Sequence, residues 1–366
     1  MFQNAKKVFS AVVLIPLLFH STELIGTLSF NELQVQSQVD GLLPIDSEIL
    51  DQLSGVQYTN DPYLVGLLSQ QFIRRLYDPI RIFVVDPCYT PYCDGITFWS
   101  QGGWGHDQLR NDGNGFGFHS TSLNLTWGAQ KTFLSDFTFG AGLSYDYEYI
   151  HYNLNGYGRM NSGFLGLYGL YRPDRFYVLA DAAFGYTQNK VHRNFVVEGF
   201  VESADSRPKF YTFTAYLEAG FDFPFSNLLV QPFAAIESIS YCRNGFTENN
   251  ASLLGLSFQK LDHTNALTRA GLHVTTYEHC WGFYFSADIS WNYRFTSSNH
   301  TLSPSFLSFG TPFNIKGVPI PRNSVEGAIT VSNHITEKLR SYIEITGEAW
   351  ARAATYNLQL GLQYLY

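Results

Sequence analysis

The chain has 366 residues, of which only 15% are charged while 17% are aromatic, and its formal net charge is −8. Soluble domains carry about 25% charged residues, so this composition predicts a surface that contacts something other than water. The acidic balance excludes a nucleic-acid-binding protein, because phosphate contacts need clustered Lys and Arg. Beyond the N-terminus no uninterrupted apolar run reaches the roughly 18 residues of a membrane helix, which excludes a helical membrane protein.

The first 26 residues have the pattern of a secretory signal. Lys6 and Lys7 precede an apolar run from Val8 to Phe19, which is the order typical of such segments. We therefore predict a signal peptide over residues 1–26 and export through the inner membrane. Because an exported chain enters an oxidising compartment, Cys88 and Cys93 are candidates for a short disulfide loop.

Two different segments separate this signal from the rest of the chain. Residues 27–60 show no convincing period, so we expect a short exported or unstructured segment there. Residues 61–94 are expected to hold a helix and a linker. Asp61 is the predicted N-cap, Pro62 the first helical residue and Pro79 the stop. One apolar face of this helix comprises Leu64, Leu68, Phe72 and Leu76.

From residue 95 onward the sequence alternates with period two, which is the signature of β-strands. In "FTFGAGLSYDYEY" the odd positions Phe137 to Tyr149 are mostly apolar, and the even positions include Asp146 and Glu148. Such segments are long enough to cross a bilayer at a tilt, which takes about 9 to 11 residues. We predict about twelve strands, at roughly 95–105, 116–132, 137–151, 160–172, 176–193, 209–225, 228–246, 264–277, 281–294, 323–333, 339–349 and 354–366.

The connections between these strands alternate in length, from turns such as 173–175 to loops such as 295–322. Short turns at one end and long loops at the other are typical of outer-membrane barrels. Closing the sheet is necessary in hydrocarbon, because an open edge would leave a row of backbone groups without hydrogen-bond partners. We therefore predict an all-β fold, a transmembrane antiparallel β-barrel of about twelve strands over residues 95–366.

The last strand, "YNLQLGLQYLY", shows the predicted orientation most clearly. Its polar residues Thr355, Asn357, Gln359 and Gln363 would face the lumen. Its lipid-facing residues would be Leu358, Leu360, Leu362, Tyr364 and Tyr366, with both tyrosines in the aromatic girdle. We regard these five as the C-terminal assembly strand.

With these features the sequence resembles the translocator domain of autotransporters, in particular the β-domain of the polymorphic outer membrane proteins. The similarity spans about 95–366, with the preceding helix as an extension. It is carried by the strand count, that helix, "LGLYGLY" followed by "FYVLADAAFGYT", "LLVQPFAAIES", "GFTENNASLLGLSF" and the terminal strand. The resemblance implies a barrel that exports its N-terminal segment, keeps the helix in its lumen and is inserted by the barrel-assembly machinery.

Charges support a helix inside the lumen independently of the resemblance. Arg74 and Arg75 lie on the predicted helix, and carboxylates lie at lumen-facing positions of the strands. Opposite charges would hold the helix in place, although an isolated exposed pair contributes little, so solvated arginines are the alternative. We expect Arg74 and Arg75 to pair with carboxylates from the set Asp146, Glu148, Glu218 and Glu344.

These observations lead to one preferred function and two alternatives. The preferred one is an outer-membrane autotransporter-type translocator with a reduced passenger, because repeated passenger motifs of the GGA-I and F-x-x-N kind are absent. The first alternative is a small-solute porin. The second is an outer-membrane enzyme using His273, Ser286 and Asp288, but no activating motif such as G-x-S-x-G accompanies them. We expect no enzymatic activity, cofactor, metal or nucleic-acid partner. The expected partners are outer-membrane lipid and a surface or host ligand of the loops.

Overall fold

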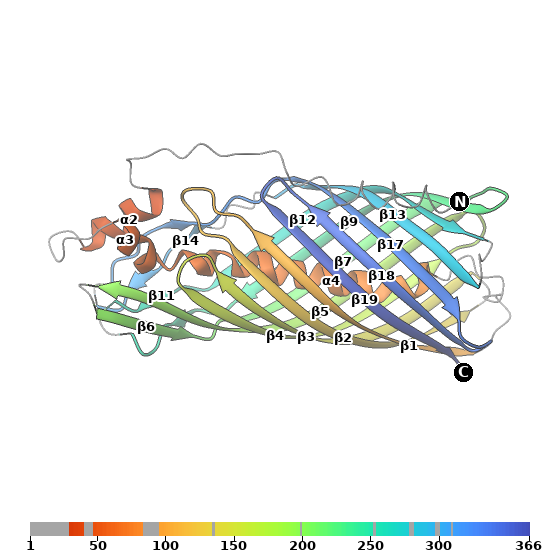
Figure 1. Cartoon of the computed structure of the whole chain (residues 1–366), viewed down its shortest axis with the longest axis horizontal. Coiled ribbons are helices and arrows are strands. Elements are labelled where there is room, and N and C mark those ends of the chain that lie inside the picture. The colour runs from red at the N-terminus through yellow and green to blue at the C-terminus, as the bar shows by residue number, and fades with distance from the viewer. Residues whose placement is uncertain are drawn as a thin grey trace, which may run out of the picture.

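Strands close one antiparallel barrel around a central helix in the computed structural model of the chain (Figure 1). The structure describes residues 29–39, 47–82, 95–133, 136–197, 200–251, 254–277, 282–296, 301–308 and 310–366. The signal peptide expected at 1–26 and the pair Cys88 and Cys93 lie outside these residues. The barrel strands are β1 (Ile96–Leu109), β2 (Phe118–Phe133), β3 (Phe137–Tyr152), β4 (Gly156–Tyr171), β5 (Phe176–Val197), β7 (Lys209–Phe221), β9 (Leu228–Arg243), β12 (Leu261–Thr276), β13 (Phe283–Arg294), β17 (Asn323–His334), β18 (Leu339–Ala349) and β19 (Ala353–Leu365).

The barrel closes by pairing its last strand with its first. β19 pairs antiparallel with β1 from Thr97 opposite Leu365 to Leu109 opposite Ala353. Each other strand pairs with its neighbours along the chain, so every barrel strand is paired on both sides. This closed ring of twelve strands confirms the predicted fold class.

Alternation along the strands separates an apolar outside from a polar inside. On β3, Phe139, Leu143 and Tyr145 are 45%, 51% and 51% exposed, while Asp146 is 2% exposed. The exposed rings and aliphatic chains form the surface that lipid covers. The inward polar residues are buried because other protein groups fill the lumen.

The two ends of the barrel differ in what connects the strands. One end, which we call the short-turn end, has tight connections such as that between β4 and β5. At the other end, the long-loop end, β5 continues beyond the barrel and pairs with β6 (Phe200–Ser206). Two small sheets also lie in the loops at this end: β10 (Phe246–Thr247), β11 (Leu256–Phe258) and β15 (Ser305–Phe306) in one, β14 (Thr301–Leu302) and β16 (Ile315–Lys316) in the other.

Helix α4 (Asp61–Arg81) runs along the inside of the barrel (Figure 1). Its bounds differ from the prediction at both ends. Asn60, not Asp61, is the N-cap residue, and Pro79 lies inside the helix instead of ending it. Among the described residues, no helix combines the length and the apolar character that crossing a membrane would require.

The segment before α4 is largely helical where the structure describes it, so the expectation of an unstructured stretch is wrong for those residues. It contains α2 (Phe30–Val39), α3 (Ser47–Ser54) and the short 3₁₀ helix η1 (Val56–Thr59). Gly55 joins α3 to η1 with φ of +68°, and a Cβ there would lie 2.5 Å from Leu256 Cδ1. These elements lie at the long-loop end (Figure 1). We call them, together with the two small loop sheets, the outer cap.

Candidate functional site

The lumen is occupied by α4, which packs tightly against the barrel wall. Leu64, Phe72 and Leu76 on its predicted apolar face are 0% exposed. Phe72 stacks on Phe164 of β4 with ring centroids 5.1 Å apart. Gly166 leaves room for the helix, since a Cβ there would lie 2.4 Å from Leu76 Cδ1. Small wall residues thus let the helix approach the strands closely.

Arg75 forms a buried ion pair with Asp146 of β3. The distance from its Nη2 to Asp146 Oδ1 is 2.6 Å, and both side chains are 2% exposed. The backbone of Arg75 is held as well. Pro79 has no N–H to donate to the carbonyl four residues back, and Gln101 Nε2 of β1 donates to that Arg75 carbonyl at 2.5 Å instead. A side chain of the barrel wall therefore provides the hydrogen bond that the Arg75 carbonyl would otherwise lack. This explains why the helix continues past Pro79.

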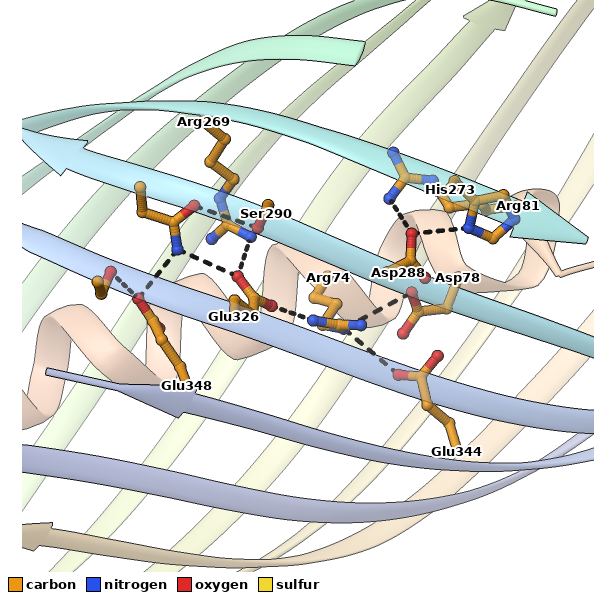
Figure 2. Close-up of polar contacts among 12 residues, drawn as sticks. Arg74, Asp78, Arg81, Arg269, His273, Asp288, Ser290, Glu326, Glu344 and Glu348 are labelled. Atoms are coloured by element: carbon orange, nitrogen blue, oxygen red, sulfur yellow. Dashed lines mark hydrogen bonds and ion pairs between the residues drawn. The ribbon is translucent and has the colours of Figure 1, made fainter. Parts of the chain in front are cut away.

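Arg74 points to a different sector of the wall and joins a network of charges (Figure 2). Its guanidinium pairs with Glu326 of β17 and, at 3.3 Å, with Glu344 of β18. Arg269 of β12 pairs with the same Glu326 at 2.6 Å and with Glu237 at 3.3 Å. Two arginines and three carboxylates therefore connect the helix to four strands.

Arg81, in the last turn of α4, is the third arginine tied to the wall. It pairs with Glu218 of β7 and lies 3.7 Å from Asp288 of β13. Its guanidinium also lies over the rings of Tyr77 and Phe233, 4.8 Å and 5.0 Å from their centroids. Cavities of about 20 Å³ and 10 Å³ adjoin this residue, and a single water needs roughly 10–15 Å³. These two cavities are thus of the size of single waters.

The structure brings together only part of the predicted set of charges. Arg75 meets Asp146, and Arg74 meets Glu344. Glu218 contacts Arg81 instead of Arg74 or Arg75, so its expected partner was wrong. Glu148 is buried but hydrogen-bonds to no other described residue.

Sequence reasoning missed Arg81, Arg269 and Glu326. Arg81 lies beyond Pro79, where the sequence predicts the end of the helix. The alternation of inward and outward residues along the strands could have identified Arg269 and Glu326, since both lie at inward positions.

His273 does not support the enzyme hypothesis. Its Nδ1 lies 2.7 Å from Asp288 Oδ1, and its Nε2 lies 2.7 Å from Thr275 Oγ1. Both ring nitrogens are occupied, so the imidazole has none left to act as a base for Ser286. Within the described part of the chain, no group of three or more His, Cys, Asp or Glu side chains could hold a metal ion.

At the long-loop end, Arg193 of β5 fastens the outer cap to the barrel. Its Nε and Nη2 donate to the two oxygens of Glu248 at 2.9 Å and 2.5 Å, and its Nη1 donates to the carbonyl of Gln52 at 2.7 Å. Tyr58 of η1 donates to Glu248 Oε1 at 2.8 Å, and its ring packs on Phe258 with centroids 4.7 Å apart. The N-terminal segment, a barrel strand and a long loop therefore share one buried, bidentate ion pair.

The C-terminal strand has the predicted orientation. Its expected lipid-facing residues are exposed by 38%, 54%, 46%, 44% and 77%, in the order Leu358, Leu360, Leu362, Tyr364 and Tyr366. Thr355, Gln359 and Gln363 are buried inward. Gln363 Nε2 donates to the carbonyl of Pro79 at 2.9 Å, so this strand also contacts the end of the helix.

Comparison with protein families gives one assignment for most of the barrel. The family described as "Autotransporter beta-domain" matches residues 98–346. No curated protein sequence matches the chain.

Solved translocator barrels share the fold. The translocator domain of autotransporter NalP from Neisseria meningitidis is 12% identical, covers 84% of this chain and 98% of its own, and has a TM-score of 0.68. The β-domain of the Bordetella autotransporter BrkA is 17% identical, covers 75% and 100%, and has a TM-score of 0.52. The transport unit of AIDA-I from Escherichia coli is 13% identical, covers 87% and 99%, and has a TM-score of 0.50.

Proposed function

This chain belongs to the autotransporter β-domain family, and from that premise we propose that it translocates its own N-terminal segment and retains it as a cap on the cell surface. Membership makes the barrel a translocator domain of the outer membrane. The passenger would be short, comprising residues 27–60.

The path of the chain through the barrel is the observation that carries this proposal. α4 fills the lumen, and the described elements before it, α2, α3 and η1, lie at the long-loop end (Figure 1). In outer-membrane barrels the long loops are extracellular and the short turns periplasmic. A chain that follows this path has its N-terminal segment on the extracellular side of the outer membrane. A passenger is on that side after translocation.

Retention follows from the contacts of the outer cap. Tyr58, Gln52 and Arg193 join the segment to the barrel within one buried network. Asn31 of α2 adds hydrogen bonds from its Nδ2 to the carbonyls of Asn114 and Lys316, at 2.8 Å and 2.9 Å. A segment held by several such hydrogen bonds is displayed and not released, because each contributes about 0.5–1.5 kcal/mol net to keeping it in place. The displayed cap and loops would form the surface for any host ligand.

Export and assembly complete the proposal. The signal-like residues 1–26 would direct the chain across the inner membrane, in a compartment where Cys88 and Cys93 would form a disulfide loop. The barrel-assembly machinery would insert the barrel through the C-terminal strand. No catalytic step of this chain's own is required, since translocator domains of the family are not themselves enzymes.

The proposal is tested by site-specific proteolysis of intact cells. A cleavage site for a sequence-specific protease is inserted at Leu33, which is 52% exposed. The matched control carries the same site in the exposed turn 335–338 at the short-turn end. We expect cleavage only at Leu33.

Protection of the Leu33 site in intact cells would contradict translocation. Rapid hydrogen exchange at Val196, whose N–H donates to Gln52 Oε1, would contradict retention. Planar bilayers provide the comparison with a small-solute porin. The filled lumen predicts low conductance for the purified protein, whereas a porin would conduct steadily.

A further inference from the structure

The outward face of the barrel carries a cluster of cations at the long-loop end of β3, β4, β5 and β7. Arg159, Lys190 and Lys209 are all exposed there. They adjoin outward tyrosines on the same strands, of which Tyr149, Tyr186 and Tyr211 are 40%, 37% and 41% exposed. We call these three cations, with the adjoining tyrosines, the outer-rim patch.

Strand register places these cations next to one another without carboxylates between them. Arg159 lies opposite Lys190 on one side and Tyr149 on the other. Lys209 lies opposite Gln188, two residues from Lys190 on the same face. Like charges directly opposite each other destabilise a strand pair, so this arrangement favours an anion shared between them.

Arg159 is oriented for such an anion by its aromatic neighbours. Its guanidinium lies over the rings of Tyr149 and Tyr157, 5.9 Å and 5.6 Å from their centroids. Stacking on a ring leaves the N–H groups at the edge of the guanidinium free to bind a phosphate with two hydrogen bonds. Asp205, beyond the patch, already accepts hydrogen bonds from His192 and Asn250 at 2.8 Å and 2.7 Å.

The patch lies where the apolar band ends. Toward the short-turn end the same strands expose Leu143, Leu165, Phe184 and Phe213, each at least 51% exposed. Aromatic girdles mark the interface between the acyl chains and the headgroups. The cations beyond them therefore lie at headgroup level, on the side of the membrane that the long loops face.

Among the barrel strands, the outward cations of the long-loop end lie on β4, β5 and β7, although the loops also expose Arg110, Lys260 and Arg352. The outward faces of β13, β17, β18 and β19 carry no Lys or Arg, and Arg294 and Arg340 on those strands point inward and are buried. A general attraction to the membrane would not require this asymmetry, whereas a bound lipid would. We propose that the outer-rim patch binds the phosphate of a phosphorylated lipid of the outer leaflet, with its acyl chains on the apolar surface below.

Binding of lipid A to the full chain in detergent tests the proposal. Native mass spectrometry would compare its diphosphorylated form with a form whose phosphates have been removed. The variant combines Arg159→Gln, Lys190→Gln and Lys209→Gln. The matched control removes the same charge from cations at the short-turn end, with Lys131→Gln, Arg175→Gln and Lys338→Gln. Retarded mobility in unheated gels verifies that each barrel is folded.

We expect the patch variant to bind diphosphorylated lipid about 100-fold more weakly, since each basic group near an anionic surface contributes about 1 kcal/mol. The control should bind like the unchanged protein, and millimolar inorganic phosphate should not compete. Equal binding of the dephosphorylated lipid by the unchanged protein would overturn the proposal without any variant. So would unchanged affinity of the patch variant, an equal loss in the control, or full competition by inorganic phosphate.

Discussion

Replacing Arg193 by Met should open the outer cap. The substitution keeps an unbranched side chain but removes the guanidinium that donates to Glu248 and Gln52. Both members of the ion pair are at most 1% exposed, so Glu248 would be left as a buried charge without a cation. Removing one partner of a buried pair costs about 3–5 kcal/mol. That corresponds to a loss of roughly two to three and a half orders of magnitude in the equilibrium constant for cap closure.

Hydrogen exchange of the purified protein measures this opening. Val196 N–H donates to Gln52 Oε1 at 2.9 Å, and Leu256 N–H donates to Glu248 Oε2 at 2.8 Å. Peptides containing these amides should exchange faster in Arg193→Met, while barrel strands keep their protection.

Two further variants make this test decisive. Lys190→Met removes a cation from the outward face of the same strand and should leave both amides protected. Adding Glu248→Leu to Arg193→Met should restore much of the protection at Val196, because an apolar pair can replace a buried ion pair at little cost. The Leu256 amide is not a reporter in this variant, since its acceptor is Glu248 itself. The reasoning is refuted if Arg193→Met exchanges like the unchanged protein, or if the double variant is more open than the single one.

Three other predictions concern the lumen, the pH response of the cap and the lipid face. Arg75→Met should lower the free energy of unfolding by about 3–5 kcal/mol, and adding Asp146→Leu should regain most of it; the fraction of folded barrel across a urea series, measured by gel mobility, decides this. Burial, followed by the charge of Glu32 and a hydrogen bond to it, raises the pKa of Asp51 to about 7. The folded cap therefore binds a proton that the unfolded cap releases, so its stability is full below about pH 4, falls as the pH rises towards 7 and remains low above it. The protection factors of the α2 amides, corrected for the intrinsic pH dependence of exchange, should be lower at pH 8 than at pH 5, and Asp51→Asn should abolish the difference. Leu360→Arg places a charge on the lipid face of the barrel. Near the bilayer midplane this should destabilise the folded barrel by about 2–4 kcal/mol. An unchanged midpoint of unfolding in urea would contradict this prediction.

The sequence by itself determined the barrel. Alternation of apolar and polar residues fixes which face of a strand meets lipid, and it does so locally, within each segment. The predicted strand 339–349 matches β18 residue for residue, and most other predicted boundaries lie within about four residues. The same alternation also predicts that Asp146 and Glu344 face the lumen. The spacing of apolar residues over 61–79 predicts the helix that carries Arg74 and Arg75.

Only the tertiary structure decided which charges meet. The rotation of α4 about its axis assigns Arg75 to β3 and Arg74 to β17 and β18, and no local pattern encodes that rotation. The position of Pro79 inside the helix could not be predicted locally either. The Arg75 carbonyl, which lacks its helical donor because proline has no N–H, accepts a hydrogen bond from Gln101 of β1.

The cap depends on tertiary structure most of all. The short helices α2 and α3 have too few residues to be stable in isolation, so their own sequence gives a weak signal. Arg193 and Glu248 stand 55 residues apart and meet only because the barrel brings a strand and a loop to the same end. Which side of a strand a residue faces depends on its neighbours in the sequence. Which charged side chains meet across a closed barrel depends on the fold of the whole chain.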